Sequence, residues 1–153
     1  AACVQAGLIF LTLNTAYTPA EVAYFVENSG AKVVLCAAAM QQGLAPVAAA
    51  TGARLETLNG DGTGSFIDLA RPCATVFDTI DRAADDLAAF LYTSGTSGRS
   101  KGAMLTHANL LSNAQTLRDY WRFTGDDVLL HALPIFHTHG LFVGTNILLL
   151  TGG

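Results

Sequence analysis

Charge is scarce in this chain. Only 13% of its 153 residues are charged, and the formal net charge is -4. Domains that bind nucleic acid present clusters of positive charge, so this acidic balance argues against a nucleic-acid partner. Apolar residues make up 51% of the sequence, which predicts a real core and much buried surface. We therefore interpret the chain as part of a larger globular body.

Cysteine is also sparse, with three residues at positions 3, 36 and 73. Their odd number and scattered spacing predict neither a disulfide framework nor a metal site. Small buried thiols in a reducing, cytoplasmic compartment are the expected arrangement. The four histidines do not form a metal site either, because His137 and His139 are only two positions apart and have no acidic or thiol neighbour.

A hydrophobic run of membrane-spanning length is missing. The apolar stretch from Leu141 to Leu150 is much shorter than the ~20 residues that a bilayer requires. The apolar opening lacks a basic lead, so a signal peptide is not predicted. The chain begins at Ala1 and its first methionine is Met40. We expect a fragment of a longer protein.

Apolar segments alternate with helix signals, which predicts an α/β fold with β-α-β units and a mostly parallel sheet. Strands are predicted at residues 8–13 and 32–36, and with the helix between them they would form a β-α-β unit whose two strands pair in parallel. Between them, Thr18, Pro19 and Glu21 form a helix start with a capping box, and Gly30 provides a stop. The inner face of that helix consists of Val22, Phe25 and Val26. The pattern repeats less clearly, with a helix near 46–51 and a strand at 54–58.

The second half of the chain continues this alternation. Strands are predicted at 87–92, 103–105 and 128–133, the last of which would bury His131. Thr106 can cap a helix whose apolar stripe is Leu110, Ala114, Leu117 and Trp121, with His107 exposed. A further helix after Gly140 is apolar nearly all round, so we expect it to be buried.

Ten residues after the strand at 87–92 combine hydroxyls, glycines and a lysine: Thr93-Ser-Gly-Thr-Ser-Gly-Arg-Ser-Lys-Gly102. Glycines allow backbone N–H groups to come close to a ligand, hydroxyls donate to phosphate oxygens, and Lys101 supplies a point charge. This composition suits a polyphosphate. A plain hairpin turn is the simpler alternative, but a turn needs only two to five residues.

A Walker P-loop is excluded by the order of the residues. That motif ends in Gly-Lys-Ser/Thr and runs directly into a helix. Here Lys101 lies between Ser100 and Gly102, and a strand is predicted to follow.

The loop resembles the phosphate-binding signature of the adenylate-forming enzymes, which include acyl-CoA synthetases, peptide-synthetase adenylation domains and luciferases. Ser97 replaces a family threonine and Ser100 replaces a family proline. Two further segments agree: Pro134-Ile-Phe-His-Thr-His-Gly140, and the segment from Ala6-Gly7 through Leu13-Asn14 to Tyr17-Thr18, in which Thr12 replaces proline. These motifs cover nearly the whole chain in the family's order. Residues around the loop and around His137 look most similar to the malonyl-CoA synthetase branch.

The resemblance implies a two-step reaction. A carboxylate attacks the α-phosphate of ATP to give an acyl-adenylate, and coenzyme A then displaces AMP to give a thioester. The residues implied to hold the β- and γ-phosphates, with Mg²⁺ nearby, are Thr93, Ser94, Gly95, Thr96, Ser97, Gly98 and Lys101. Lys101 would offset charge on the departing pyrophosphate, and His137 matches the histidine that lies beside the acyl-adenylate. A solvated loop lysine and a structural histidine are the alternatives.

Other roles remain open at this point. Phe136 would line the acyl or nucleotide pocket, and His139 either meets a second carboxylate or is a turn residue. The family's later motifs, with its adenine and ribose contacts and its small C-terminal domain, do not appear, so residues 1–153 are expected to be a piece of the N-terminal domain that is inactive alone. The rival hypotheses are a coumarate-type or fatty acyl-CoA ligase and a truncated, non-catalytic binding module.

Overall fold

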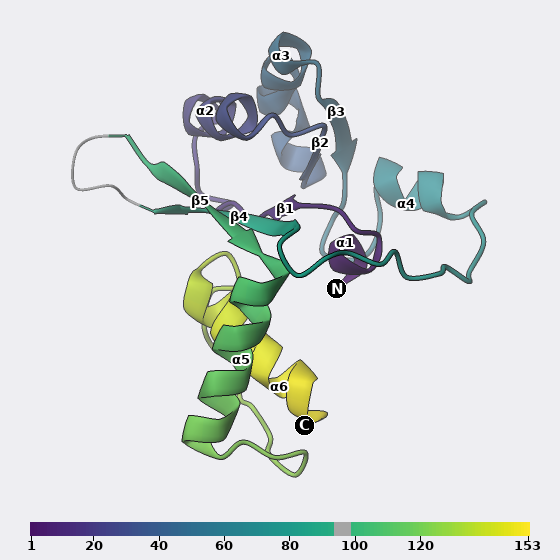
Figure 1. Ribbon diagram of the computed structural model, residues 1–153. Helices are drawn as coiled ribbons and strands as arrows, with labels where there is room; N and C mark the ends of the chain where they lie inside the picture. Colours follow the sequence, from purple (N-terminus) through teal and green to yellow (C-terminus); the bar gives the residue numbers. More distant parts are fainter. Residues whose placement is uncertain (94–98) are drawn as a thin grey trace. The chain divides into compact units, whose positions relative to one another are not determined.

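A computed structural model describes residues 1–93 and 99–153 of the chain, which form two compact units. One unit joins Ala1–Asn14 to Asp78–Gly153, and the other is Thr15–Phe77. Figure 1 shows the helices and strands of both. Each unit contains a parallel pair of strands, β1 with β4 and β2 with β3. The predicted α/β class is confirmed.

The unit Thr15–Phe77 contains strands β2 (Val33–Cys36) and β3 (Arg54–Thr57) with helices α2 (Pro19–Ser29), α3 (Gln41–Thr51) and α4 (Ser65–Ala70). A short 3₁₀ turn, η1 (Ala38–Met40), precedes α3. The predicted start of α2 is confirmed. The backbone N–H of Thr18 donates to the Glu21 carboxylate at 2.8 Å, and the Glu21 N–H donates to the Thr18 hydroxyl. Gly30 ends the helix in the left-handed conformation.

The predicted pairing of the first two strands was wrong. Strand β1 (Phe10–Leu11) is shorter than the predicted residues 8–13. It pairs with β4, which belongs to the same unit, whereas β2 pairs with β3. The strand ends at Leu11, and the chain turns at Thr15 and Ala16 before α2 begins. The β-α-β unit is instead β2, α3 and β3, whose strands are in register from Val33 with Arg54 to Cys36 with Thr57.

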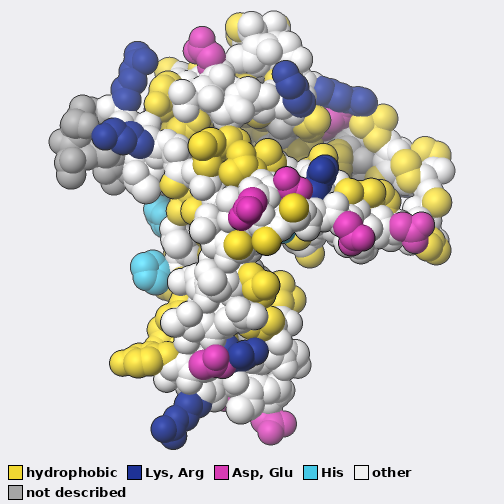
Figure 2. Space-filling view, viewed as in Figure 1, with side chains coloured by type: hydrophobic (Ala, Val, Ile, Leu, Met, Phe, Trp, Pro, Cys, Tyr) yellow, Lys and Arg dark blue, Asp and Glu magenta, His cyan; other side chains and the backbone are white. Residues whose placement is uncertain are grey.

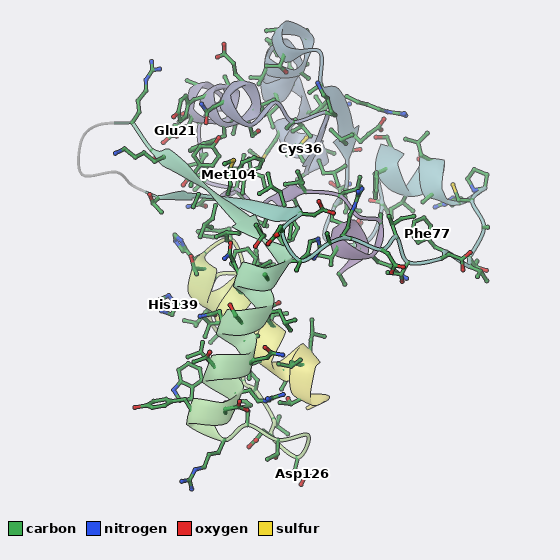
Figure 3. The ribbon with its side chains drawn as sticks, viewed as in Figure 1. Glu21, Cys36, Phe77, Met104, Asp126 and His139 are labelled. Atoms are coloured by element: carbon green, nitrogen blue, oxygen red, sulfur yellow. The ribbon has the colours of Figure 1, made fainter. Side chains whose placement is uncertain are left out.

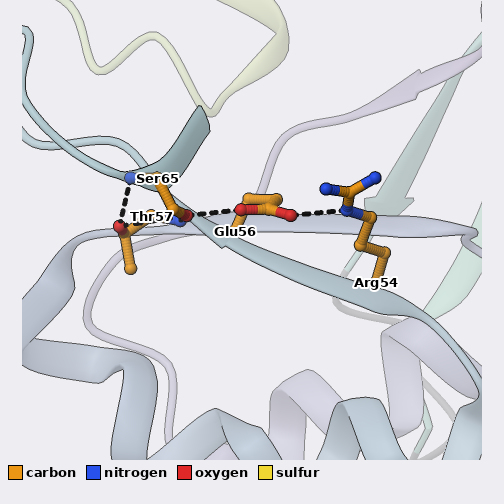
Figure 4. Close-up of polar contacts among 4 residues, drawn as sticks. All are labelled: Arg54, Glu56, Thr57 and Ser65. Carbon is orange, nitrogen blue, oxygen red and sulfur yellow. Dashed lines mark hydrogen bonds and ion pairs between the residues drawn. The ribbon is translucent and has the colours of Figure 1, made fainter. Parts of the chain in front are cut away.

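A polar cluster of four residues joins β3 to the start of α4: Arg54, Glu56, Thr57 and Ser65 (Figure 4). The Glu56 carboxylate, which is largely buried, accepts hydrogen bonds from the Ser65 hydroxyl and from the Arg54 guanidinium. These two bonds hold the pKa of Glu56 below its ordinary value. Backbone N–H groups of Thr57 and Ser65 each donate to the other residue's hydroxyl at 2.9 Å. Both oxygens of the largely buried Glu56 carboxylate therefore have a partner within the cluster.

The other unit is built on a three-stranded sheet in the order β1-β4-β5, with β4 (Leu87–Thr93) in the centre and antiparallel to β5 (Lys101–Thr106). Ala88 and Ala89 of β4 are fully buried. The other elements of this unit are α1 (Ala2–Gln5), α5 (His107–Trp121), the π-helical turn η2 (His139–Gly144) and α6 (Thr145–Thr151). Thr106 caps α5 as predicted, with its hydroxyl accepting from the Asn109 N–H at 3.1 Å.

Several predictions for this unit were wrong. Residues 128–133 form no strand, and Val128 and Leu130 are 95% and 91% exposed, because no described strand lies beside them. His131 is therefore exposed rather than in the core. Helix α6 buries only one side: Ile147 is buried, while Leu149 is 70% exposed. In α5, Ala114 is buried but Trp121 is half exposed.

The three cysteines are unpaired, and only Cys36 is buried, so the expectation of buried thiols was wrong for Cys3 and Cys73. His107 is half-buried rather than exposed, since its position follows directly on β5. Within residues 1–93 and 99–153, no helix is both long and apolar enough to cross a bilayer.

Candidate active site

Strands β4 and β5 bring the two ends of the predicted phosphate loop together. Thr93, the last residue of β4, lies directly opposite Lys101, the first residue of β5. Both side chains are exposed, and Figure 2 shows Lys and Arg side chains at the surface at this end of the hairpin. The predicted binding residues Ser94, Gly95, Thr96, Ser97 and Gly98 lie outside the described residues. The hairpin therefore places a hydroxyl and an ammonium group at the two ends of the loop, where β4 and β5 meet it. We call this position the mouth of the loop.

The glycine after the lysine has a steric cause. Gly102 pairs with Tyr92 across the hairpin, and a Cβ atom at this position would lie 3.1 Å from Cζ of the Tyr92 ring. This distance is tighter than ordinary carbon contacts, so the ring would have to move to admit a side chain. The order Lys-Gly thus lets Tyr92 cover β5 next to Lys101.

A second group of candidate residues lies in Pro134–Gly140, which we call the histidine loop. The loop closes on itself, because the His137 N–H donates to the Pro134 carbonyl at 3.2 Å and Gly140 packs against that same carbonyl. A Cβ at Gly140 would lie less than 3.0 Å from the Pro134 oxygen, so only glycine fits. The glycine of the sequence motif is therefore required by close packing of two backbone segments.

The side chains of this loop face solvent around a shallow pocket. Leu133, Pro134, His137, His139 and Gly140 line the pocket. The rings of Phe136 and His137 are in contact, with centroids 4.5 Å apart and planes tilted by 51°. His139 lies at the edge of the unit (Figure 3) and is exposed at the start of η2. The structure thus brings His137 and His139 together, as their spacing requires.

His131 holds the histidine loop from outside. Its Nε2 atom lies 2.8 Å from the Gly140 carbonyl oxygen, and the Thr145 hydroxyl donates to the same oxygen at 2.9 Å. Sequence reasoning missed both residues. The position of His131, three residues before the motif that begins at Pro134, could have indicated this contact. A polar side chain at that position can bind the backbone of the turn that follows.

The structure also shows the surroundings of two arginines near the end of α5 and of two residues in the most N-terminal motif. Arg118 is paired with Asp119, whose pKa the guanidinium lowers through a 2.7 Å hydrogen bond, and Arg122 is exposed at the end of α5. Gly7, from the most N-terminal motif, adopts the left-handed conformation, and its carbonyl accepts from Arg82 Nε at 3.1 Å. In the other unit, the Tyr17 ring packs against Phe25 with centroids 5.2 Å apart.

Within the described ranges 1–93 and 99–153, no group of three or more His, Cys, Asp or Glu side chains is arranged to hold a metal ion.

Among the described residues, the unit thus combines Thr93 and Lys101, paired at the end of the β4–β5 hairpin, with a compact loop that presents His137. A search against known families matches the whole chain, residues 1–153, to the AMP-binding enzymes. The chain belongs to this family, as the motifs predicted.

Individual relatives are consistent with this assignment. ATP-bound MatB from Rhodopseudomonas palustris is 58% identical and superposes with a TM-score of 0.94, covering 99% of this chain and 30% of that protein. An oxalate–CoA ligase from Arabidopsis thaliana is 32% identical over 150 residues, covering 94% of this chain and 29% of the relative. A malonate–CoA ligase from the same plant is 30% identical over 138 residues, covering 89% and 23%. The chain thus spans less than a third of the length of these proteins.

Proposed function

We propose that the protein containing this chain activates a carboxylic acid with ATP and transfers it to coenzyme A, and that the acid is malonate. The observation that carries the proposal is the register of Thr93 with Lys101, which closes a loop of phosphate-binding composition with a cation at its mouth. Family membership supplies the reaction class. The similarity to ligases of malonate and oxalate supports a short dicarboxylate as the substrate.

In the first step, a carboxylate oxygen attacks the α-phosphorus of ATP. The bond from that phosphorus to the bridging oxygen breaks, and pyrophosphate leaves with the electron pair. Negative charge develops on the leaving oxygens, so a fixed ammonium group lowers the barrier. Lys101 carries this role in our proposal. Its place in a hydrogen-bonded strand fixes its backbone, while its exposed side chain can reach the phosphates.

In the second step, the thiolate sulfur of coenzyme A attacks the acyl carbonyl, and AMP leaves with the oxygen. A free carboxylate does not react with a thiol, because it lacks a leaving group; adenylation supplies one. We assign His137 to a position beside the acyl-adenylate, next to the Phe136 ring.

Three unpaired thiols support a reducing, cytoplasmic setting.

The acid can be identified by forming products from a panel of carboxylates. The full-length protein is incubated with ATP, Mg²⁺, coenzyme A and either malonate, oxalate, 4-coumarate or octanoate, and thioesters are measured by mass spectrometry. We expect malonyl-CoA to form fastest. Coumaroyl-CoA or octanoyl-CoA as the main product would contradict malonate as the substrate but would support the proposed reaction. No thioester from any acid, despite ATP binding, would favour a non-catalytic binding module.

A further inference from the structure

The hydrogen bonds around Gly140 point to a function for a histidine outside the sequence motif. We propose that His131 is a positioning residue that holds the histidine loop, and with it His137, in the geometry needed for acid activation. This inference rests on the proposed function. His131 Nε2 and the Thr145 hydroxyl approach the Gly140 carbonyl oxygen at 2.8 Å and 2.9 Å.

Both contacts converge on Gly140, the last residue of the histidine loop. His131 comes before the loop in the sequence, and Thr145 comes after η2. The last residue of the loop is therefore bound by one residue from each flanking segment. At the same residue, Gly140 packs against the Pro134 carbonyl, which also accepts from the His137 N–H. A shift of Gly140 would therefore move the acceptor that fixes the His137 backbone.

The backbone around Gly140 makes this support necessary. Residues His139–Gly144 form a π-helical turn, a wide and uncommon conformation that is often found at functional sites. The imidazole lies directly against this turn, since a Cβ built at Gly144 would lie 3.5 Å from His131 Nε2, an ordinary van der Waals contact. Side-chain donors on the Gly140 carbonyl thus stabilise a local geometry that an ordinary helix would not adopt.

The interaction also fixes the form of the imidazole ring. A carbonyl oxygen only accepts, so Nε2 must carry the proton and Nδ1 must be the free acceptor in the neutral ring. Thr145 donates to the same carbonyl, whose oxygen has two lone pairs, and its hydroxyl oxygen also lies 3.4 Å from His131 Nε2. This tautomer can be measured independently of any activity.

A double-mutant cycle tests the positioning role in the full-length protein, with malonate-dependent exchange of pyrophosphate into ATP as the assay. We expect His131→Leu to lower the exchange rate roughly tenfold, since a small misplacement of a site residue can cost this much or more. In a His137→Ala background the same substitution should have almost no further effect, because the residue it positions is gone. Equal losses in both backgrounds would show a general structural role and overturn the proposal.

Two further measurements sharpen this test. Glutamine places an amide nitrogen close to the position of Nε2, so His131→Gln should restore most of the exchange rate, whereas His107→Leu serves as a histidine control with no expected loss. Long-range ¹H–¹⁵N NMR of the chain should show His131 as the Nε2–H tautomer. A predominant Nδ1–H tautomer, or no rescue by glutamine, would contradict the proposal even if the ligase reaction is confirmed. If no acid supports exchange, the proposed function fails while the tautomer result still decides the hydrogen bond.

Discussion

The polar side chains of the two units are used in different ways. In the unit Thr15–Phe77, the cluster of Arg54, Glu56, Thr57 and Ser65 satisfies itself, since these side chains bind one another and the backbone next to them. In the other unit, His131 and Thr145 bind a backbone carbonyl, while the side chains of His137 and Lys101 in the same unit remain exposed. A polar cluster that is closed on itself stabilises the fold, whereas a loop whose backbone is held leaves side chains available for a substrate.

The largest effect in this comparison is expected from Lys101. Lys101→Ala should slow pyrophosphate exchange on the order of 100-fold, as the loss of one fixed charge donor does in other enzymes. Its side chain is exposed, so stability should not change. The matched control is Lys32→Ala, because Lys32 is exposed, is the only other lysine and lies in the unit to which we assign no chemistry. Equal exchange rates for the two variants would remove the role given to Lys101.

The next effect is on stability. Gly140→Ala should destabilise its unit by about 2 kcal/mol, because the new Cβ meets backbone that cannot rotate away. Trp121 is the only tryptophan and belongs to the same unit, so its fluorescence during urea unfolding reports this change. Gly144→Ala is the control in the same unit, since its added Cβ would make only ordinary contacts, the nearest at 3.4 Å from Leu129 Cδ2. A wild-type midpoint for Gly140→Ala would mean that the histidine loop is not closed as described.

Helix caps should give similar, smaller effects in both units. Thr18→Ala and Thr106→Ala each remove a hydroxyl that accepts from a backbone N–H, which costs about 1 kcal/mol. The Thr106 variant should shift the Trp121 fluorescence transition. The Thr18 variant should instead speed amide exchange in α2. If either substitution changed both readouts equally, the two units would unfold together, and the comparison would hold for function only.

The smallest effect is the pH dependence of the polar cluster. Hydrogen bonds from Ser65 and Arg54 lower the pKa of Glu56, so the carboxylate stabilises the folded state above its ordinary pKa of 4.5. This contribution is lost as pH falls from 4.5 through the lower pKa of the folded state. The protection of the Thr57 and Ser65 amides, measured as the exchange rate relative to the intrinsic rate at the same pH, should fall over that range. Glu56→Gln should make the protection of these two amides less dependent on pH, and an unchanged profile would contradict the assignment.

Local signals in the sequence predicted much of this fold. Thr18, Glu21 and Gly30 define both ends of α2 through contacts within a few residues, and the apolar run before Thr93 predicted β4. Strand pairing depends on distant partners, so the placement of β1 beside β4 could not be read from periodicity. The exposed segment 128–133 has the composition of a strand, yet no described strand pairs with it.

The candidate site was predictable to a similar extent. Residue order predicts a phosphate loop, because the chemistry of phosphate binding restricts which residues can be used, and the family motif predicts a role for His137; both stay predictions. The hydrogen bond from His131 to Gly140 was not predictable, since it depends on a π-helical turn and on how the histidine loop folds back. The sequence favoured a buried His131 on the basis of its apolar neighbours.

The central claim is that phosphate binds at the mouth of the β4–β5 hairpin and not in the unit Thr15–Phe77. The most direct test is a titration of the ¹⁵N-labelled chain with Mg²⁺-ATP, followed by the amide signals of assigned residues. We predict saturable shifts at Thr93, Lys101 and Gly102, with Glu56 and Ser65 unchanged. Shifts confined to Glu56, Ser65 and their neighbours, or an unperturbed Thr93 and Lys101 at saturating ATP, would contradict the claim.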